Sequence, residues 1–374
     1  MPSWLKEGRG SLCGANVSLL LRERGITKPL LVAGERTKNV FFARTGMRLP
    51  VFDAFHPNPD LQDCVAGAAL YQEKGCDGLI SIGGGSAMDT AKGIKALLMT
   101  DIAHVWANQL PPEGKVPHLA IPGTAGTGAE TTAVAVLYED GQKLSVDHPA
   151  LLPDGVLLDG SLLDTLPEYH RKSCAMDALA QGIESWWAKK ATPGSRIHAE
   201  RAIRGVLDNL TAYLQGDRKA QDEMLHAAYE SGVAILTTRT TAAHAMSYQI
   251  TKKLGAAHGH ACMLTLPHLW AHLAAQAEYQ PMLTELAHIL GGEKPMDGAV
   301  LLKGLLAVLE LDKIPMPDDA TLDMLAASVN PERLGNHPEA LTTAQLRAIY
   351  VQAFTPMTDT ERAEAIAAWE QYGK

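Results

Sequence analysis

A buried strand that runs through three glycines into a helix constrains the fold of this chain more than any other segment. Residues 78–82 read GLISI, and residues 83–98 read GGGSAMDTAKGIKALL. Glycines let the backbone approach a ligand closely, and the start of a helix offers free N–H groups and a positive dipole end. The pattern is neither GxGxxG nor a P-loop. A plain glycine-rich turn would also produce it, but we interpret it as a phosphate-binding turn.

A second strand that ends in small residues follows at 120–132, which read AIPGTAGTGAETT. The hydroxyls of Thr124 and Thr127 can donate hydrogen bonds to phosphate oxygens or to a carboxamide. Two such loops after successive strands suit a dinucleotide that lies across the carboxyl edge of a sheet. We therefore predict a dinucleotide site formed by both loops.

Short strands alternate with helices over the first 160 residues, which predicts an α/β sheet domain. A helix is expected at 61–74, where Gly75 ends it, and a β-hairpin at 133–146 with Glu139-Asp140-Gly141 as its turn. The other expected strands are 29–34, 50–55, 78–82, a run from 120, and 153–159.

Beyond Leu166-Pro167 the strand patterns stop, and caps and breakers separate a series of helices. These are expected at 172–190, 194–215, 218–238, 241–254, 260–276, 279–291, 297–309, 320–329, 343–354 and 359–371. We therefore predict two domains, a dinucleotide-binding α/β domain at 1–165 and a helical domain at 166–374. The natural site is the cleft between them.

Composition limits the partners of the chain. A formal charge of −9 argues against nucleic acid and against an anionic membrane surface. No apolar run is long enough to span a bilayer, and the N-terminal residues lack the apolar core of a signal peptide. Five cysteines without a CxxC pair suit free thiols in a reducing compartment. We expect a cytoplasmic protein.

Candidate metal ligands lie in the helical half. Asp177, Gln181 and Glu184 share one helix face at i, i+4 and i+7. Two histidines further on, His244 and His258, would be ~21 Å apart on a straight helix, but the glycine at 255 supplies a break that could fold the second one back. Oxygen and imidazole ligands suit Fe²⁺ or Zn²⁺. Solvated helix faces and surface histidines are the alternative explanation.

Together these motifs resemble the iron-containing (group III) alcohol dehydrogenase family over nearly the whole chain. GGGSAMDTAK and IPGTAGTGAETT are similar to its two cofactor loops, and MDALAQGIESWWAKKATPGS and HAMSYQITKKLGAAHGHACMLTLPH to its two metal-binding segments. The resemblance implies a Rossmann-like α/β N-terminal domain and an all-α C-terminal domain, the fold shared with dehydroquinate synthase. It also implies a homodimer and a metal-dependent, NAD(P)H-linked hydride transfer between a small aldehyde and its alcohol.

The resemblance places Asp177, His244 and His258 at the family's metal positions. A fourth ligand, usually histidine, is replaced here by Gln181, which could bind through its amide oxygen or leave the position to water. Tyr248 stands where the family commonly has a histidine near the nicotinamide. We expect Tyr248 or metal-bound water to supply the proton in the reaction, with His258 completing the catalytic set.

The resemblance assigns the cofactor to the glycine turn and the threonine loop. The expected residues are Gly84, Gly85, Ser86, Thr124 and Thr127, with Asp89, Lys92 and Lys143 in or beside the loops. Both lysines could equally be ordinary solvated side chains. Family members that prefer NAD tend to have Asp at the position of Gly34, and Arg36 lies two residues on, which favours NADPH over NADH. Glu35 could still face the ribose.

The motifs SYQIT, HGHA and LPHLW, with Gln in DALAQGIESWW, look like a subgroup that includes phosphonoacetaldehyde reductases. This implies a two-carbon aldehyde with a strong anion, phosphonoacetaldehyde or sulfoacetaldehyde, for which Lys252 and Lys253 are candidate contacts. His260 could face the cleft or cap a helix. The alternatives are a general short-chain alcohol or diol dehydrogenase, a dehydroquinate synthase-like lyase, or a binding protein with a decayed metal site.

Overall fold

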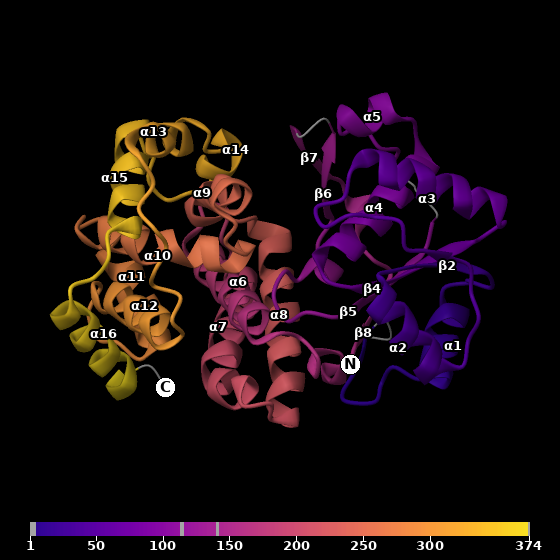
Figure 1. Cartoon of the computed structure of the whole chain (residues 1–374), viewed down its shortest axis with the longest axis horizontal. Coiled ribbons are helices and arrows are strands. Elements are labelled where there is room, and N and C mark those ends of the chain that lie inside the picture. The colour runs from indigo at the N-terminus through magenta and orange to yellow at the C-terminus, as the bar shows by residue number, and fades with distance from the viewer. Residues whose placement is uncertain (1–4, 113–115, 140–141, 373–374) are drawn as a thin grey trace. The chain divides into compact units, whose positions relative to one another are not determined.

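The computed structural model describes residues 5–112, 116–139 and 142–372 (Figure 1). The chain divides into two compact units. Unit 1 comprises residues 1–166 and 216–232, and unit 2 comprises residues 167–215 and 233–374. The predicted division after residue 165 lies one residue from the first of these boundaries. Segment 216–232, which the sequence led us to expect in the second domain, groups with unit 1 instead.

Unit 1 is built on a six-stranded parallel sheet with the order β1-β8-β5-β4-β2-β3. Its strands are β1 (Leu5–Glu7), β2 (Pro29–Ala33), β3 (Val51–Phe52), β4 (Gly78–Gly83), β5 (His118–Pro122) and β8 (Gly155–Leu158). β2, β4 and β5 are buried along their whole length, as in a parallel sheet covered on both faces. The predicted α/β class is confirmed, although β3, an edge strand, is shorter than the predicted run 50–55.

Helices cover both faces of this sheet because alternate residues of each strand point to opposite sides. Leu30 and Val32 of β2 pack with residues of α3 (Leu61–Glu73) and α4 (Gly85–Met99). Leu31 of the same strand packs with residues of α1 (Gly14–Glu23) and α2 (Glu35–Thr45). A short helix, α5 (Ile102–Trp106), follows α4.

The predicted β-hairpin is present as β6 (Val134–Glu139) and β7 (Gln142–Asp147), which pair antiparallel. Two residues of its predicted turn, 140 and 141, lie outside the described residues. Short 3₁₀ turns occupy Ala129–Thr131, Pro149–Leu151 and Gly160–Leu163.

Residues 216–232 join unit 1 through close contacts that run along α8 (Arg218–Thr238) from Asp222 to Gly232. A Cβ on Gly232 would collide with the carbonyl oxygen of Gly128 and the hydroxyl of Thr131. The carboxylate of Asp222 accepts a hydrogen bond from the N–H of Gly160 at 2.9 Å. Helical periodicity alone does not reveal which unit a helix packs against, so the sequence did not predict this grouping.

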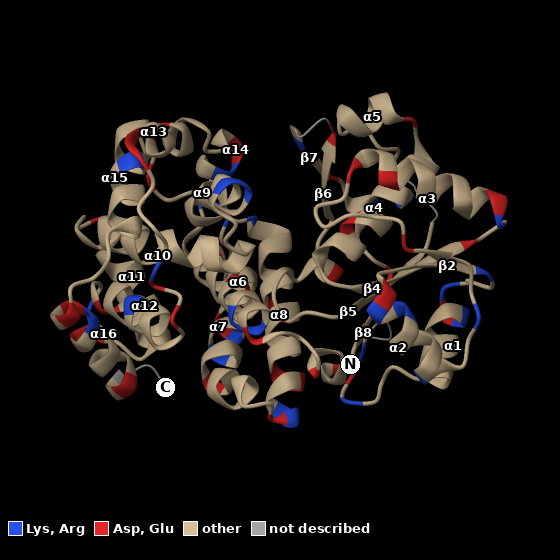
Figure 2. Ribbon diagram, in the orientation of Figure 1, with Lys and Arg blue, Asp and Glu red and all other residues tan. Residues whose placement is uncertain are grey.

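All the regular elements described in unit 2 are helices, which confirms the predicted all-α domain. Besides the end of α8 they are α6 (Glu168–Trp187), α7 (Pro193–Leu214), α9 (Ala242–Gln249), α10 (His258–Ala274), α11 (Gln280–Leu290), α12 (Asp297–Val308), α13 (Asp319–Ala327), α14 (Pro331–Leu334), α15 (Thr343–Phe354) and α16 (Asp359–Tyr372). Within the described residues, none of the helices combines the length and the apolar character needed to cross a bilayer. Acidic and basic residues are interspersed along the ribbons of both units (Figure 2).

The predicted helix 241–254 differs from the structure in its second part. α9 ends at Gln249, and Ile250–Leu254 forms a π-helical turn. Gly255 ends this turn with φ of +74°, a left-handed conformation that glycine adopts without a steric penalty. The break that the sequence suggested at this glycine is therefore present, one turn of π-helix after the end of α9.

An aromatic cluster that contains a buried histidine lies in the core of unit 2. Trp187 packs edge-on against Trp270 and His337, with both pairs of ring centroids 5.8 Å apart. His337 is 0% exposed, and neither of its ring nitrogens has a hydrogen-bond partner among the described residues. Burial lowers the pKa of His337 to about 4 because the charged imidazolium would lose its hydration.

Replacing His337 with Phe should make the protein less sensitive to acid. Between pH 6.5 and about 4 the unfolded chain binds a proton at this histidine that the folded chain does not, so wild-type stability falls as the pH drops through that window. Each pKa unit corresponds to about 1.4 kcal/mol, so between pH values of about 8 and about 5 the variant should lose ~2 kcal/mol less than wild type.

Urea denaturation at these two pH values measures the difference. His288→Phe, which changes an exposed histidine of α11, is the control and should behave as wild type. An unchanged pH dependence in His337→Phe would contradict the assignment of a neutral buried imidazole.

Candidate metal centre and cofactor loops

The carboxyl ends of β2 and β4 lie side by side where the order of the sheet reverses. After β2 the chain adds β3 on one side and then returns to add β4 on the other. Open α/β sheets bind ligands at such a switch point. Ala33 pairs with Ile82, so Gly34 and the glycine turn emerge at the same level. Thr37 of α2 donates to the carbonyl of Ile82 at 3.0 Å and ties the two strand ends together.

The two predicted cofactor loops are in contact at this edge. A Cβ on Gly84 would lie 3.3 Å from the methyl carbon of Thr124, and a Cβ on Gly85 would lie 3.3 Å from that of Thr127. Gly84 is the N-cap of α4 and offers no side-chain acceptor to the first N–H groups of that helix. The structure therefore brings these four sequence-predicted residues together around the start of α4.

Lys92 lies beside the second loop and is enclosed by unit 1, so it is not an ordinary solvated lysine. Its side chain is 0% exposed. The ammonium group donates to the carbonyls of Ala129 and Val134 at 2.7 and 2.9 Å and to the hydroxyl of Thr132 at 3.1 Å. These acceptors satisfy all three of its donors. Lys92 therefore fixes the end of the second loop from inside unit 1.

The other predicted residues of the glycine turn lie along α4 and beside it. Burial raises the pKa of Asp89 to about 7, against the opposing charges of Lys92 and Lys143. Lys143, on β7, is half-buried and close enough to Asp89 to influence its charge. Ser86 is half-exposed, and its hydroxyl accepts a hydrogen bond from the N–H of Asn58 at 3.2 Å.

Open space lies beside the end of β2. The residues at this strand end are expected to decide between NADH and NADPH. No atom lies within 4 Å of the position that a Cβ on Gly34 would take. Arg36 is exposed, and its guanidinium donates to the hydroxyl of Thr165. Glu35 is also exposed and forms an ion pair with Lys38 at 3.4 Å.

In unit 2 the polar face predicted on α6 points into the protein. Asp177, Gln181 and Glu184 are 3%, 4% and 0% exposed, so the solvated-face alternative does not apply. Buried carboxylates require hydrogen bonds or opposite charges. The partners of these three side chains come from the chain around the two predicted histidines.

Glu184 caps the N-terminus of α9. One oxygen of its carboxylate accepts hydrogen bonds from the N–H groups of Thr241 and Ala243 at 3.1 and 2.9 Å, and from the Thr241 hydroxyl at 2.6 Å. A negative charge at this position satisfies free N–H groups and favours the helix dipole. The cap fixes where α9 begins and hence where its side chains point.

The second oxygen of Glu184 orients His244. The Nδ1–H of His244 donates to that oxygen, which turns Nε2 of the ring toward Asp177. Nε2 faces Asp177, with 3.2 Å to its Oδ1. Burial would raise the pKa of Asp177, but the hydrogen bond with His244 and the nearby His258 hold it below its ordinary value. A carboxylate behind a histidine is the usual support of a metal ligand.

The turn at Gly255 brings His258 back to His244, and their ring centroids are 5.3 Å apart. The Nδ1 of His258 lies 3.2 Å from the hydroxyl of Ser247. That hydroxyl donates its own hydrogen to the carbonyl of His244 at 2.8 Å, so it accepts from Nδ1–H. Both histidines therefore present Nε2 to the same point.

Close packing of α10 on α6 completes the arrangement. A Cβ on Gly259 would collide with the carbonyl oxygen of Ser173 and with the backbone N of Asp177. Only glycine permits this approach, which brings the first turn of α10 onto the aspartate. Because Gly259 packs on α6, the preceding residue, His258, lies at the cluster.

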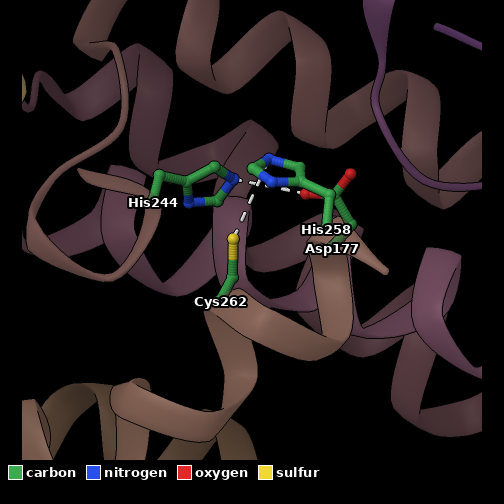
Figure 3. A group of neighbouring side chains, drawn as sticks. All are labelled: Asp177, His244, His258 and Cys262. Atoms are coloured by element: carbon green, nitrogen blue, oxygen red, sulfur yellow. Dashed lines mark hydrogen bonds and ion pairs between the residues drawn. The ribbon is translucent and has the colours of Figure 1, made fainter. Parts of the chain in front are cut away.

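Four side chains converge at this point, and the fourth is Cys262 (Figure 3). One potential ligand atom from each of Asp177, His244, His258 and Cys262 lies within 4.8 Å of all the others. The imidazoles lower the pKa of the Cys262 thiol to about 7, although burial acts to raise it. One carboxylate, two imidazoles and one thiol at this spacing fit a divalent ion such as Zn²⁺.

Gln181, the expected fourth ligand, is buried beside the cluster and interacts with Asp177. Its amide nitrogen donates to Oδ1 of that carboxylate at 3.2 Å. A carboxylate accepts only, so the NH₂ group of the amide must face it. This hydrogen bond therefore restrains the carboxylate of Asp177, which lies one turn before Gln181 on α6.

The remaining predicted residues of this segment differ in their surroundings. Tyr248 is half-buried, and its ring stacks on that of His258 with centroids 6.0 Å apart. Lys252 and Lys253 are exposed on the π-helical turn that follows α9. His260 is buried, and its Nε2–H donates a hydrogen bond to the carbonyl of Leu311 at 2.8 Å. It is therefore a structural residue of unit 2 and not a helix cap.

Sequence reasoning missed two residues of this site. Glu184 was recognised as part of a helix face but not as the partner of His244, because that contact joins residues 60 positions apart. Cys262 was counted only as a free thiol. It lies four residues after His258, so both side chains share one face of α10, and this spacing was the available sign.

Comparisons with known proteins match both units. Residues 3–160 match the family model described as iron-containing alcohol dehydrogenase, and residues 172–354 match the C-terminal model of the Fe-containing alcohol dehydrogenase family. Among solved structures, sulfoacetaldehyde reductase from Bifidobacterium kashiwanohense in complex with NAD⁺ is similar, with a TM-score of 0.85 and 25% identity. That similarity covers 95% of this chain and 97% of the other.

Curated relatives are about one third identical to this chain over the segments that align. A probable alcohol dehydrogenase, EutG, of Escherichia coli is 34% identical over 65% of this chain and 60% of its own length. The phosphonoacetaldehyde reductase of Streptomyces viridochromogenes is 35% identical over 57% of this chain and 58% of its own length. The chain thus spans about 60% of the length of these two relatives. The NAD-dependent methanol dehydrogenase of Bacillus methanolicus is 30% identical over 75% of this chain and 77% of its own length.

Replacing Glu184 with Gln should weaken metal binding roughly 10- to 100-fold. Both carboxylate oxygens accept hydrogen bonds, whereas an amide has a single acceptor oxygen. The variant must therefore turn its NH₂ group either toward the N–H groups of α9 or toward the ring of His244. Competition with a chromophoric chelator for Zn²⁺ measures the effect.

Glu168→Gln, which makes the same change on an exposed part of α6, is the matched control and should bind as wild type. Equal affinities of Glu184→Gln and this control would show that the carboxylate does not support a metal ligand.

Proposed function

This chain belongs to the iron-containing alcohol dehydrogenase family of oxidoreductases, and on that premise we propose that it reduces a small aldehyde to the alcohol with NAD(P)H and a divalent metal ion. The observation that carries the proposal is the convergence of Asp177, His244 and His258, each supported by a second residue, next to the ring of Tyr248. A decayed metal site would not be expected to keep the ligand atoms of both histidines within 4.8 Å of one carboxylate oxygen.

In the proposed reaction Asp177, His244 and His258 hold a divalent ion, Fe²⁺ or Zn²⁺. When bound, the ion polarises the carbonyl oxygen as a Lewis acid, and the reduced nicotinamide supplies the hydride to the carbonyl carbon. Glu184 keeps the Nε2 atom of His244 directed at the ion, and Ser247 does the same for His258. These hydrogen bonds hold the ligands in place before the substrate arrives.

Tyr248 is the proposed proton donor to the oxygen that becomes the alcohol. A phenol hydroxyl can donate a proton to a developing alkoxide when it is within hydrogen-bond reach. The stacking of its ring on His258 places it against a proposed metal ligand. Tyr248 thereby takes a role at the position where the family commonly has a histidine.

The glycine turn and the threonine loop are the proposed cofactor site. Gly84, Gly85 and Ser86 would bring the pyrophosphate to the N–H groups at the start of α4, with Thr124 and Thr127 as hydroxyl donors. Asp89 and Lys143 lie beside this site. We propose NADPH as the preferred form because no carboxylate occupies position 34 and Arg36 is exposed two residues on.

A two-carbon aldehyde with a strong anion, phosphonoacetaldehyde or sulfoacetaldehyde, is the proposed substrate. Similarity to a phosphonoacetaldehyde reductase and to a sulfoacetaldehyde reductase supports this choice. Lys252 and Lys253 supply positive charge on the turn after α9, and Lys252 is four residues from Tyr248 in the sequence.

We further propose a cytoplasmic homodimer. All five cysteines lie in the described part of the chain and are free, which suits a reducing compartment. The end of unit 2 exposes apolar side chains at Met296, Val300 and Val308, which a second copy could cover.

Anionic two-carbon aldehydes should be reduced at least about tenfold more efficiently than acetaldehyde, ~1.4 kcal/mol in transition-state binding. The measurement is kcat/KM for NADPH oxidation with phosphonoacetaldehyde, sulfoacetaldehyde, acetaldehyde and a short diol-derived aldehyde. The double variant Lys252→Gln/Lys253→Gln should raise KM for the anionic aldehydes alone.

Lys294→Gln, which removes an exposed lysine elsewhere in unit 2, is the control. Equal efficiencies for charged and uncharged aldehydes would favour a general short-chain alcohol dehydrogenase. No oxidation of NAD(P)H with any aldehyde, with Fe²⁺ or Zn²⁺ added, would reject aldehyde reduction.

Gly34→Asp should shift the cofactor preference from NADPH toward NADH. The open space beside Gly34 can accept the side chain, whose carboxylate would repel a 2′-phosphate and accept a hydrogen bond from a ribose hydroxyl. The ratio of kcat/KM for NADPH to that for NADH should fall at least about tenfold. An unchanged ratio would show that the adenosine ribose does not lie at the end of β2.

A further inference from the structure

We propose that Cys262 binds the metal ion as a thiolate and is its fourth protein ligand, and that Gln181 positions Asp177 without touching the ion. The inference rests on the metal site proposed above and specifies its ligand set. It departs from the expectation that the side chain at position 181, or water, completes the site.

The distances within the cluster fit a tetrahedral ion. With Zn–N and Zn–O near 2.0–2.1 Å and Zn–S near 2.3 Å, tetrahedral ligand atoms lie ~3.3–3.6 Å from one another. In the structure Nε2 of His244 is 3.2 Å from Oδ1 of Asp177, and Nε2 of His258 is 3.9 Å from Sγ of Cys262. All four atoms lie within 4.8 Å of one another. Side-chain shifts of about an ångström or less would bring the four ligand atoms onto one ion.

The placement of Cys262 on α10 makes it a rigid ligand. His258 and Cys262 are one helical turn apart, a spacing that puts two ligands on one helix face, as the paired histidines of HExxH zinc sites do. Close packing at Gly259 fixes this end of α10 against α6. Cys262 is also 0% exposed. Its sulfur is therefore held at the cluster by the same contact that positions His258.

The hydrogen bond of Gln181 is made to a proposed ligand, the carboxylate of Asp177. Its amide nitrogen faces the carboxylate of Asp177 at 3.2 Å, and an amide nitrogen that donates a hydrogen bond does not bind metal. This bond fixes the rotation of the Asp177 carboxylate, which is the role expected of a group behind a ligand. Gln181 is thus a positioning residue.

A thiolate also changes the charge and softness of the site. With Asp177 and Cys262 both ionised, the ligands carry two negative charges and neutralise a divalent ion, whereas an amide in place of the thiolate would leave one positive charge uncompensated. Sulfur ligands favour Zn²⁺ over harder ions. The set of one carboxylate, two imidazoles and one thiolate therefore predicts that the protein retains Zn²⁺ more firmly than Fe²⁺.

X-ray absorption spectroscopy of the full-length protein, stripped with a chelator and reloaded with Zn²⁺, tests the ligand set. We expect one sulfur at about 2.3 Å and nitrogen or oxygen atoms at about 2.0–2.1 Å. In Cys262→Ser the sulfur shell should be lost, and Zn²⁺ affinity should fall by more than the roughly 10- to 100-fold that loss of a supporting partner causes. Gln181→Leu should keep the sulfur shell.

Cys76→Ser, which replaces a half-buried thiol of unit 1, is the matched control and should keep both the shell and the affinity. Should Cys262→Ser fail to fold, the wild-type spectrum still decides, and Co²⁺ loading gives a second readout. Wild-type protein should then show a thiolate-to-cobalt charge-transfer absorption in the near ultraviolet.

Two results would overturn the inference, namely a wild-type metal shell of nitrogen and oxygen alone, or a sulfur shell that persists in Cys262→Ser. Aldehyde reduction is assayed separately on the same preparation. An active protein without bound sulfur rejects the role of Cys262 and leaves the proposed function in place. A protein that binds no metal and oxidises no NAD(P)H rejects both.

Discussion

The proposed metal centre depends on the buried carboxylate of Glu184. One of its oxygens accepts hydrogen bonds from N–H groups at the start of α9, and the other accepts a hydrogen bond from the ring of His244. Because a carboxylate has acceptors on both sides, a single residue of α6 sets both the position of a helix and the direction of a ligand on it. Its burial is tolerated because hydrogen bonds surround it on both sides. Without this contact, α9 would have no fixed start relative to Asp177.

Unit 1 uses a buried charge in the same way. Lys92 is enclosed, and its ammonium group holds two carbonyls and a hydroxyl at the end of the threonine loop. Removing a buried charge from water is costly unless every donor finds an acceptor, and here each one does. In each unit one fully buried ion therefore fixes a functional segment through its backbone groups.

The chain departs from its family at positions that lie around one point in space. Gln181 takes the place of a ligand histidine, while Cys262 brings a sulfur atom to the cluster from another helix. Tyr248, which also replaces a histidine, stacks on His258 at the same site. If the ligand lost from α6 is replaced by the sulfur of Cys262 on α10, the site keeps four ligands, one of which is softer than histidine. This would give one physical reason for the residues at positions 181 and 262, which look unrelated in the sequence.

The sequence by itself determined the division into an α/β and a helical part, the two loops at the strand ends, and the candidates Asp177, His244 and His258. These follow from periodicity, from glycine and from family motifs, all of which are local in the chain. The packing of 216–232 on unit 1, the enclosure of Lys92 and the convergence of Cys262 on the cluster were decided only by the tertiary structure. They depend on contacts such as that of Gly259 with α6, which join residues about 80 positions apart. A local pattern shows which face of a helix is buried, but only packing decides what that face meets.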